Sequence, residues 1–205
     1  MSSSLKTSIA SPEGALSFLF SIFALLMWYV SVTTSNEATY FSIGLTWIVL
    51  SLGALMASLI NMIRGSEKGN TNLLATILLG FFPGLNMLIS LALNKAGFSY
   101  QPTIIGLMYM IGAIFCFGAA WTRRYQPLYI WLRTILVSIG LFFVGFGDLT
   151  DLRFFLALGG WNLLMYSLLS LYYGLSILYP YYGKSLPQGK SLFELLGNKT
   201  PAPKK

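Results

Sequence analysis

Six long apolar runs occupy most of this 205-residue chain, and almost no ionisable side chain lies inside them. An apolar run of about 18 or more residues is long enough to cross the hydrocarbon core of a bilayer, roughly 30 Å thick, as a helix. Such a segment must satisfy its backbone polar groups internally, because the hydrocarbon core contains no water. The sequence therefore predicts an all-α integral membrane protein with six transmembrane helices. The predicted spans are residues 14–33, 40–63, 73–94, 103–121, 128–147 and 154–180.

The composition supports a single membrane domain. Hydrophobic residues make up 56% of the chain and charged residues 9%, whereas soluble domains carry about 25% charged residues. The first apolar run is too long for the apolar region of a typical signal peptide, so we interpret it as the first span. We expect a cytoplasmic N-terminal segment at 1–13, a six-helix membrane domain at 14–180 and a cytoplasmic C-terminal tail at 181–205.

Lysine and arginine are distributed unequally between the two sides of the predicted bundle. If the N-terminus is cytoplasmic, ten of the 13 fall on the inner side, and the outer loops hold only Lys95 and Arg153. The remaining one, Arg133, lies inside the fifth span. Because positive residues concentrate on the cytoplasmic side of membrane proteins, both termini are predicted to be cytoplasmic. The same distribution accounts for the net charge of +7 without a nucleic-acid partner.

Several chemical functions lack the residues that they need. The chain has no histidine and one cysteine, Cys116, so a disulfide framework and a Cys/His zinc site are excluded. Asp148 and Asp151 fall in an outer turn beside Arg153, where capping a helix is the expected role. We therefore expect no bound metal, no cofactor and no enzymatic activity.

Polar side chains inside the spans are nearly all neutral. They suit a path for small, weakly polar or protonated solutes, and they equally suit hydrogen bonds between neighbouring helices. Arg133 is the exception and lies about 9 Å along the helix from Pro127. We expect it to reach the inner interface or to pair with a carboxylate, with contact to a solute as the alternative. The neutral residues are Ser21, Ser58, Asn61, Thr76, Asn86, Ser138, Asn162 and Ser167.

The third span contains the sequence Gly-Phe-Phe-Pro-Gly at 80–84. Helix packing or a kink is one interpretation, because proline removes a backbone donor and small residues allow close approach. The other is a broken helix that exposes backbone carbonyls to a pathway, with Asn86 close by.

Short motifs in the loops and the tail resemble those of one transporter family. Lys68-Gly69-Asn70-Thr71 follows the second span, Gly160-Trp161 lies in the sixth, and residues 182–189 read YGKSLPQG. In this order and spacing they resemble the acetate uptake transporter, or succinate–acetate permease, family. The resemblance implies six helices with both ends inside, assembled as a hexamer with one pathway per subunit.

The resemblance also implies candidate site residues. The family motif Asn-Pro-Ala-Pro-Leu-Gly-Leu, thought to lie on the solute path, corresponds to residues 11–17, where Ser11 and Pro12 match its start. Ser58 falls near a path glutamine of the second span. The family's apolar constriction would be formed by Phe20 and Leu136, whereas its third aromatic is replaced near Leu79 or Gly80.

Two functional hypotheses follow. The first is a channel or transporter of the cell (plasma) membrane for acetate or a similar small monocarboxylate, with proton coupling, whose partners are membrane lipid and further copies of the chain. A carboxylate loses more hydration energy than the neutral acid on entering an apolar gate. The alternative is a non-transporting accessory subunit of a larger respiratory or energy-transducing complex, suggested by the altered N-terminal motif and the missing aromatic.

Overall fold

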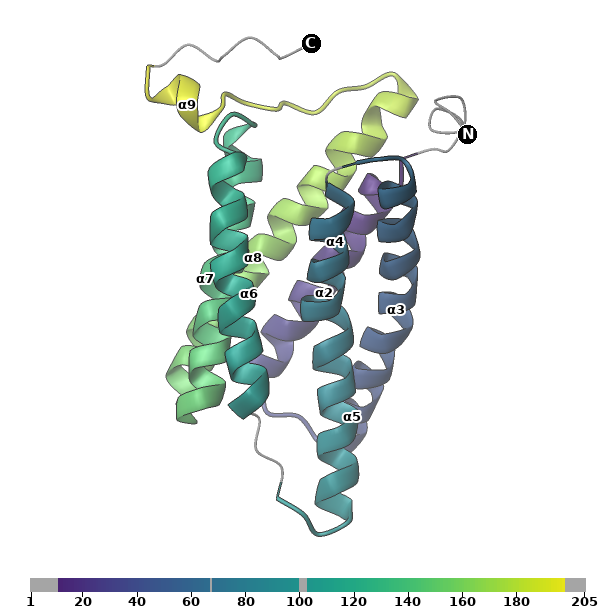
Figure 1. Ribbon diagram of the computed structural model, residues 1–205, viewed down its shortest axis with the longest axis vertical. Coiled ribbons are helices and arrows are strands. Elements are labelled where there is room, and N and C mark those ends of the chain that lie inside the picture. Colours follow the sequence, from purple (N-terminus) through teal and green to yellow (C-terminus); the bar gives the residue numbers. More distant parts are fainter. Residues whose placement is uncertain (1–10, 67, 100–102, 198–205) are drawn as a thin grey trace.

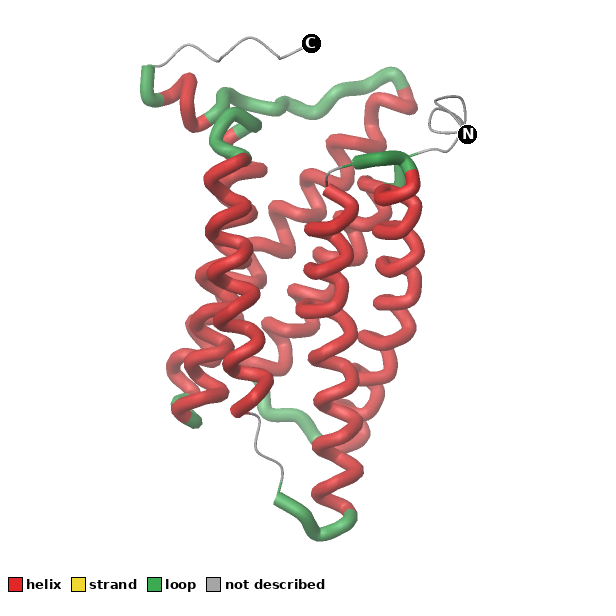
Figure 2. Tube along the Cα trace, viewed as in Figure 1, coloured by secondary structure: helices red, strands yellow, loops and turns green. Residues whose placement is uncertain are grey.

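The computed structural model describes residues 11–66, 68–99 and 103–197. Six of its helical segments are long and apolar enough to cross a membrane, and Figure 2 shows the helices joined by loops. The fold class is therefore confirmed as an all-α, multi-pass membrane protein. The helices are α2 (Glu13–Val32), α3 (Glu37–Ile63), α4 (Lys68–Thr76), the π-helix η1 (Ile77–Phe81), α5 (Phe82–Lys95), α6 (Thr103–Thr122), α7 (Leu128–Thr150), α8 (Arg153–Leu178), the 3-10 turn η2 (Tyr179–Tyr182) and α9 (Leu192–Leu195).

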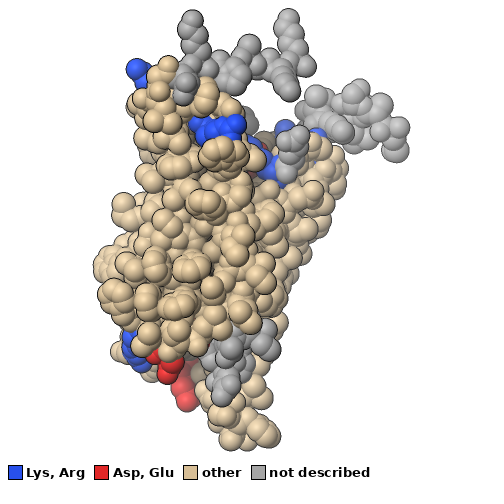
Figure 3. Space-filling model, turned by 60° about the vertical axis from the view of Figure 1, so that its left-hand side comes forward, with Lys and Arg blue, Asp and Glu red and all other residues tan. Residues whose placement is uncertain are grey.

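The two ends of the bundle differ in charge as the sequence predicts. The start of α2, the end of α8 and α9 lie together at one end (Figure 1), which we call the cytoplasmic end because the predicted inner cations lie there. The other is the outer end. On the face shown in Figure 3, charged side chains gather at the two ends and an uncharged band separates them. This band is the surface that a bilayer requires.

The six spans close into a ring around a shared core. Helix α2 packs along α8, α8 along α7 and α7 along α6, while α3 packs against α4 and α5 and also touches α2. The ring is thinnest between α6 and the third span, which meet chiefly at η1. Glycines set the closest helix approach: a Cβ on Gly106 of α6 would lie 2.7 Å from the Gly145 carbonyl oxygen of α7.

The third span, Lys68–Lys95, stays helical throughout but widens at its middle. Its start lies five residues before the predicted one, because the polar residues ahead of the apolar run are also helical. Pro83 has no backbone N–H, and the π-turn η1 directly precedes it. The span is thus distorted at the Gly80–Gly84 segment rather than broken there.

Neutral polar side chains join neighbouring helices. The Ser167 hydroxyl of α8 donates to the Ser21 carbonyl oxygen of α2 at 2.8 Å, and the Ser138 hydroxyl of α7 donates to the Ala113 carbonyl oxygen of α6 at 2.6 Å. For these serines the structure supports the packing role that the sequence left open beside a role in a solute path.

Candidate functional site

Two pockets enter the bundle, one from each end. The pocket at the cytoplasmic end, called the inner pocket, lies between α2, α4, η1, α6, α7 and α8. Its charged lining consists of Glu13, Lys68, Arg123 and Arg133. The apolar side chains that reach deepest into it include Phe20 of α2, Leu79 of η1 and Val137 of α7. The inner pocket therefore combines an excess of positive charge with an apolar floor.

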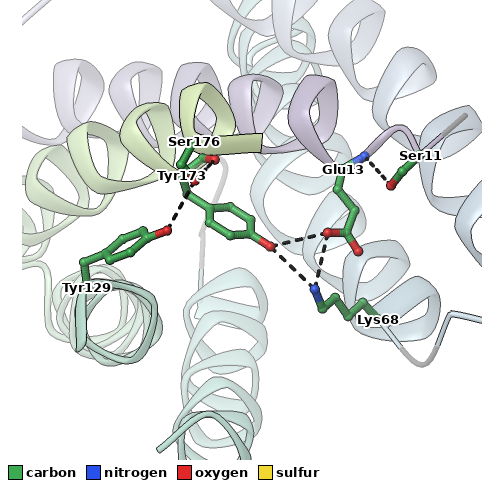
Figure 4. Close-up of polar contacts among 6 residues, drawn as sticks. All are labelled: Ser11, Glu13, Lys68, Tyr129, Tyr173 and Ser176. Carbon is green, nitrogen blue, oxygen red and sulfur yellow. Dashed lines mark hydrogen bonds and ion pairs between the residues drawn. The ribbon is translucent and has the colours of Figure 1, made fainter. Parts of the chain in front are cut away.

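One carboxylate of the inner pocket is already neutralised. The Lys68 ammonium lies 3.3 Å from Glu13 Oε2, and the Tyr173 hydroxyl donates to the same oxygen at 3.4 Å (Figure 4). The Glu13 backbone N–H also donates to the Ser11 hydroxyl at 3.5 Å. These contacts join the start of α4 to the start of α2 and to the turn before α2. They also compensate the negative charge of Glu13.

The two arginines of the inner pocket are held by neutral groups. The Arg133 guanidinium carbon lies 4.3 Å from the centre of the Tyr173 ring, a cation–π contact. The Arg123 Nη1 donates to the Thr134 hydroxyl at 3.0 Å. Burial and the nearby Arg133 charge lower the pKa of the Arg123 guanidinium from its usual range. Lys68–Glu13 is the one ion pair found among the described residues, so neither arginine has a carboxylate partner there.

The pocket at the outer end, called the outer pocket, has the opposite charge. Its acidic lining residues are Glu37 of α3, which is exposed, and Asp148 of α7, which is half-buried. Asn86 of α5, Tyr109 of α6 and Trp47 of α3 also line it. The two pockets thus present cations on the cytoplasmic side and carboxylates on the outer side.

A layer of buried apolar side chains, called the seal, separates the two pockets. Along α2 the inner pocket ends at Phe20 and the outer pocket begins at Met27, a separation of about 10 Å at the rise of an α-helix. Between them lies Phe23, whose exposed fraction is 0%, and Leu141 of α7 is 1% exposed at the same level. The ring centres of Phe20 and Phe23 are 6.2 Å apart. These side chains separate the two pockets in this conformation.

The structure brings two of the predicted loop-motif residues to the lining of the inner pocket, together with Phe20. Lys68, Thr71 and Phe20 line it. Pro12 is the N-cap of α2, next to Ser11. Gly69 is buried against α3, where a Cβ would lie 2.8 Å from the Met62 nitrogen, whereas Asn70 is exposed.

Three other predicted residues lie elsewhere. Leu136 packs against the core without lining either pocket, and its neighbour Val137 takes the position in the inner pocket. Ser58 is fully buried between α3 and α4, where its hydroxyl lies 3.4 Å from that of Thr76. Asn86 lines the outer pocket. Their assignment to a solute path stays a prediction.

Three pocket residues carry little signal in the sequence. Arg123 belongs to a basic loop between two predicted spans, and Glu13 directly follows the two residues that match the start of the family motif. Tyr173 lies within an apolar run. Arg133 is the one charged residue within a predicted span, but it stacks on Tyr173 instead of pairing with a carboxylate.

Among the described residues, no group of three or more His, Cys, Asp or Glu side chains could hold a metal ion.

The fold of this chain is similar to that of a solved membrane protein. No protein-family model matches the sequence, and no curated protein matches it. Among solved structures, that of the bacterial acetate channel SatP is similar, with a TM-score of 0.68 and 15% identity. The match covers 89% of this chain and 100% of the SatP chain. At this level of identity the likeness concerns the fold, and it supports the acetate-permease-like arrangement of six helices that the loop motifs suggest.

Proposed function

We propose that this protein conducts a small monocarboxylate, such as acetate, across the cell membrane through the centre of its six-helix bundle. The single observation that carries the proposal is the pair of pockets that enter the bundle from opposite ends and approach each other at the seal. The fold likeness to an acetate channel supports the same function, although fold alone does not determine function.

The seal favours the neutral acid over the carboxylate. Phe20, Phe23 and Leu141 offer no hydrogen bond to a passing solute, and a charged group entering such a layer loses far more hydration energy than a neutral one. Hydrophobic constrictions also exclude water and ions when they are narrow. A carboxylic acid that crosses in its protonated form carries its proton with it, which couples solute movement to the proton gradient.

The opposite charges of the pockets fit inward movement of an acid. The exposed carboxylate of Glu37 repels the anion at the outer end, so the protonated solute enters there more easily. At the inner end the arginines stabilise the anion that forms when the solute loses its proton. Net uptake of acid is the expected direction when the outside is acidic.

Extensive apolar faces are available for lipid and for further copies of the chain. Along α3 and α6, large apolar side chains that mostly recur every three or four residues are exposed on the outside of the bundle. We extend the proposal to a homo-oligomer with one path in each subunit. Native mass measurement of the protein in nanodiscs tests this part, and a strictly monomeric protein would contradict it.

The purified protein in proteoliposomes provides the decisive experiment. We expect uptake of labelled acetate above that of empty liposomes, rising as the external pH falls and accompanied by acidification of the lumen. The absence of uptake for acetate, propionate and lactate at any pH would overturn the proposal. Stoichiometric foreign subunits after purification in mild detergent, together with no flux, would favour the accessory-subunit alternative.

A further inference from the structure

Arg133 is a buried cation whose hydrogen-bonding capacity is incompletely used. It lies within α7, and 8% of its surface is exposed. Its Nη1 is buried and has no hydrogen-bond partner in the described structure, while its guanidinium stacks on Tyr173. A buried donor without an acceptor is costly, and the cost is larger for a charged group. The side chain lines the inner pocket, where a bound molecule could supply the acceptor.

A second arginine lines the same pocket. Arg123 comes from the connection between α6 and α7, and its contact with Thr134 places it one residue along α7 from Arg133. Two like charges in a partly buried site repel each other unless an anion lies between or beside them. An anion beside Arg123 and Arg133 would therefore stabilise their arrangement.

The protein itself supplies no anion for these arginines. Glu13 is the one carboxylate among the lining residues, and its Oε2 is bound by Lys68 and Tyr173. With Lys68 balanced by Glu13, both guanidinium charges are left over. An excess of two positive charges above an apolar floor attracts a small anion, because the buried surroundings screen the charges less than bulk water does.

The lining selects among anions. On one side are guanidinium groups, which match the two oxygens of a carboxylate in geometry. On the other side are Phe20, Leu79 and Val137, which accept an alkyl group but cannot solvate a second charge. A short monocarboxylate fits both surfaces. A dicarboxylate would place its second charge on the apolar floor, and chloride would leave that floor unused.

From these observations we propose that Arg123 and Arg133 form a binding site for the carboxylate of a short monocarboxylate at the cytoplasmic end of the bundle. The inference rests on the proposed function for the role of this ligand as transported solute, but the binding site itself is testable without transport. Tyr173 acts as a positioning residue, because its ring supports Arg133 and its hydroxyl holds Glu13 away from the arginines.

Binding to the full chain in nanodiscs provides the test. Acetate, propionate, butyrate, succinate and chloride are titrated separately by calorimetry against the wild type, Arg133→Gln, Arg133→Lys, Arg123→Gln and Arg124→Gln. Arg124 is the matched control: it stacks on Trp121 and Tyr125 and is absent from the pocket lining. Thermal unfolding of each variant checks that it remains folded.

We expect saturable monocarboxylate binding that Arg133→Gln or Arg123→Gln weakens by about ten- to a hundredfold, the size of a lost charged hydrogen bond. Arg133→Lys is expected to fall between the wild type and Arg133→Gln, and Arg124→Gln to bind as the wild type does. Equal binding by folded Arg133→Gln and wild type would overturn the inference. Equal or tighter binding of chloride or succinate would overturn its ligand class.

Flux measurements separate this inference from the proposed function. If monocarboxylates bind and their binding requires Arg133, but proteoliposomes show no flux, the binding site is supported and the transport function is overturned. If flux occurs, and Arg133→Gln changes neither binding nor the concentration for half-maximal flux, the transport function is supported and the binding site is overturned.

Discussion

The inner and outer pockets are built by the same six-helix ring, yet they differ in how they treat charge. The inner pocket holds three cationic side chains and one carboxylate, while the outer pocket holds two carboxylates. The membrane orientation rule explains part of this difference, because it concentrates lysine and arginine in the cytoplasmic loops. It does not explain Arg133, which lies inside a span and points into the pocket. The positive charge of the inner pocket therefore depends on the position of Arg133 within α7 as well as on the distribution of cations between the loops.

The largest effect is expected from joining the two pockets. Phe23→Ala removes a fully buried ring from the seal and should lower the free energy of unfolding by about 3–5 kcal/mol. It should also increase acetate flux and reduce its preference for low pH, because water can enter the enlarged gap. Proteoliposome flux and thermal unfolding measure the two effects.

Phe18→Ala is the matched control for the seal, since Phe18 lies on the same helix with 50% of its surface exposed. It should alter neither flux nor its pH dependence. A Phe23→Ala protein with unchanged flux and stability would show that the layer between the pockets is not the barrier.

The next largest effect is expected from steric clashes, and it should differ between the two ends of the bundle. In Gly106→Ala the new methyl would meet the Gly145 carbonyl oxygen near the outer pocket, whereas in Gly69→Ala it would meet the Met62 backbone beside the inner pocket. Each should cost about 1–3 kcal/mol of stability through overpacking, but only Gly69→Ala should weaken monocarboxylate binding. Calorimetry on both proteins tests this difference.

Gly118→Ala provides the control for these substitutions. Nothing lies within 4 Å of a Cβ at that position, so alanine should leave stability unchanged or raise it by up to about 1 kcal/mol through helix propensity. Equal losses in all three proteins would indicate that helix geometry, rather than the close approach of neighbours, sets the cost.

A smaller effect is expected from neutralising the outer pocket. Glu37→Gln removes an exposed negative charge and should raise acetate uptake at neutral external pH by about two- to tenfold, because the anion is no longer repelled. Asp148→Asn, at a half-buried carboxyl group, should have a smaller effect. Uptake at acidic pH, where the neutral acid dominates, should change little. Uptake that is unchanged at both pH values would mean that the outer charges do not control access.

The smallest effect is expected at the ion pair of the inner pocket. Lys68→Met breaks the contact with Glu13, in which the side chains are 42% and 22% exposed. Such an exposed pair contributes at most about 1 kcal/mol, so thermal unfolding should shift only slightly. Binding should weaken, because Glu13 is freed to neutralise the arginines.

Lys95→Met, at the outer end of α5, is the control for Lys68→Met and should leave binding unchanged. If Lys68→Met binds monocarboxylates more tightly than the wild type, Glu13 does not compete with the ligand for Arg123 and Arg133.

The membrane class and the six spans follow from the sequence alone, which also predicts the orientation of the bundle. These follow from the length of the apolar runs and the distribution of lysine and arginine, which are local properties of the chain. The loop motif around Lys68 also pointed to a fold that the structural comparison supports. The expected distortion near Pro83 likewise follows from local chemistry, because proline has no N–H to donate.

The contacts between side chains of different spans in the inner pocket depend on the tertiary structure. Glu13, Lys68 and Tyr173 come from the first, third and sixth spans, and Arg123 comes from the connection before the fifth. The hydrophobic periodicity of one span does not predict which residues of other spans it contacts. The rotation of each helix and its contacts are set by packing across the whole ring. Packing also sets which of two neighbours lines the inner pocket: Val137 lines it, whereas Leu136 packs against the core, since adjacent residues point about 100° apart on a helix. The spans follow from local hydropathy, whereas the charge of the pocket depends on how six helices pack together.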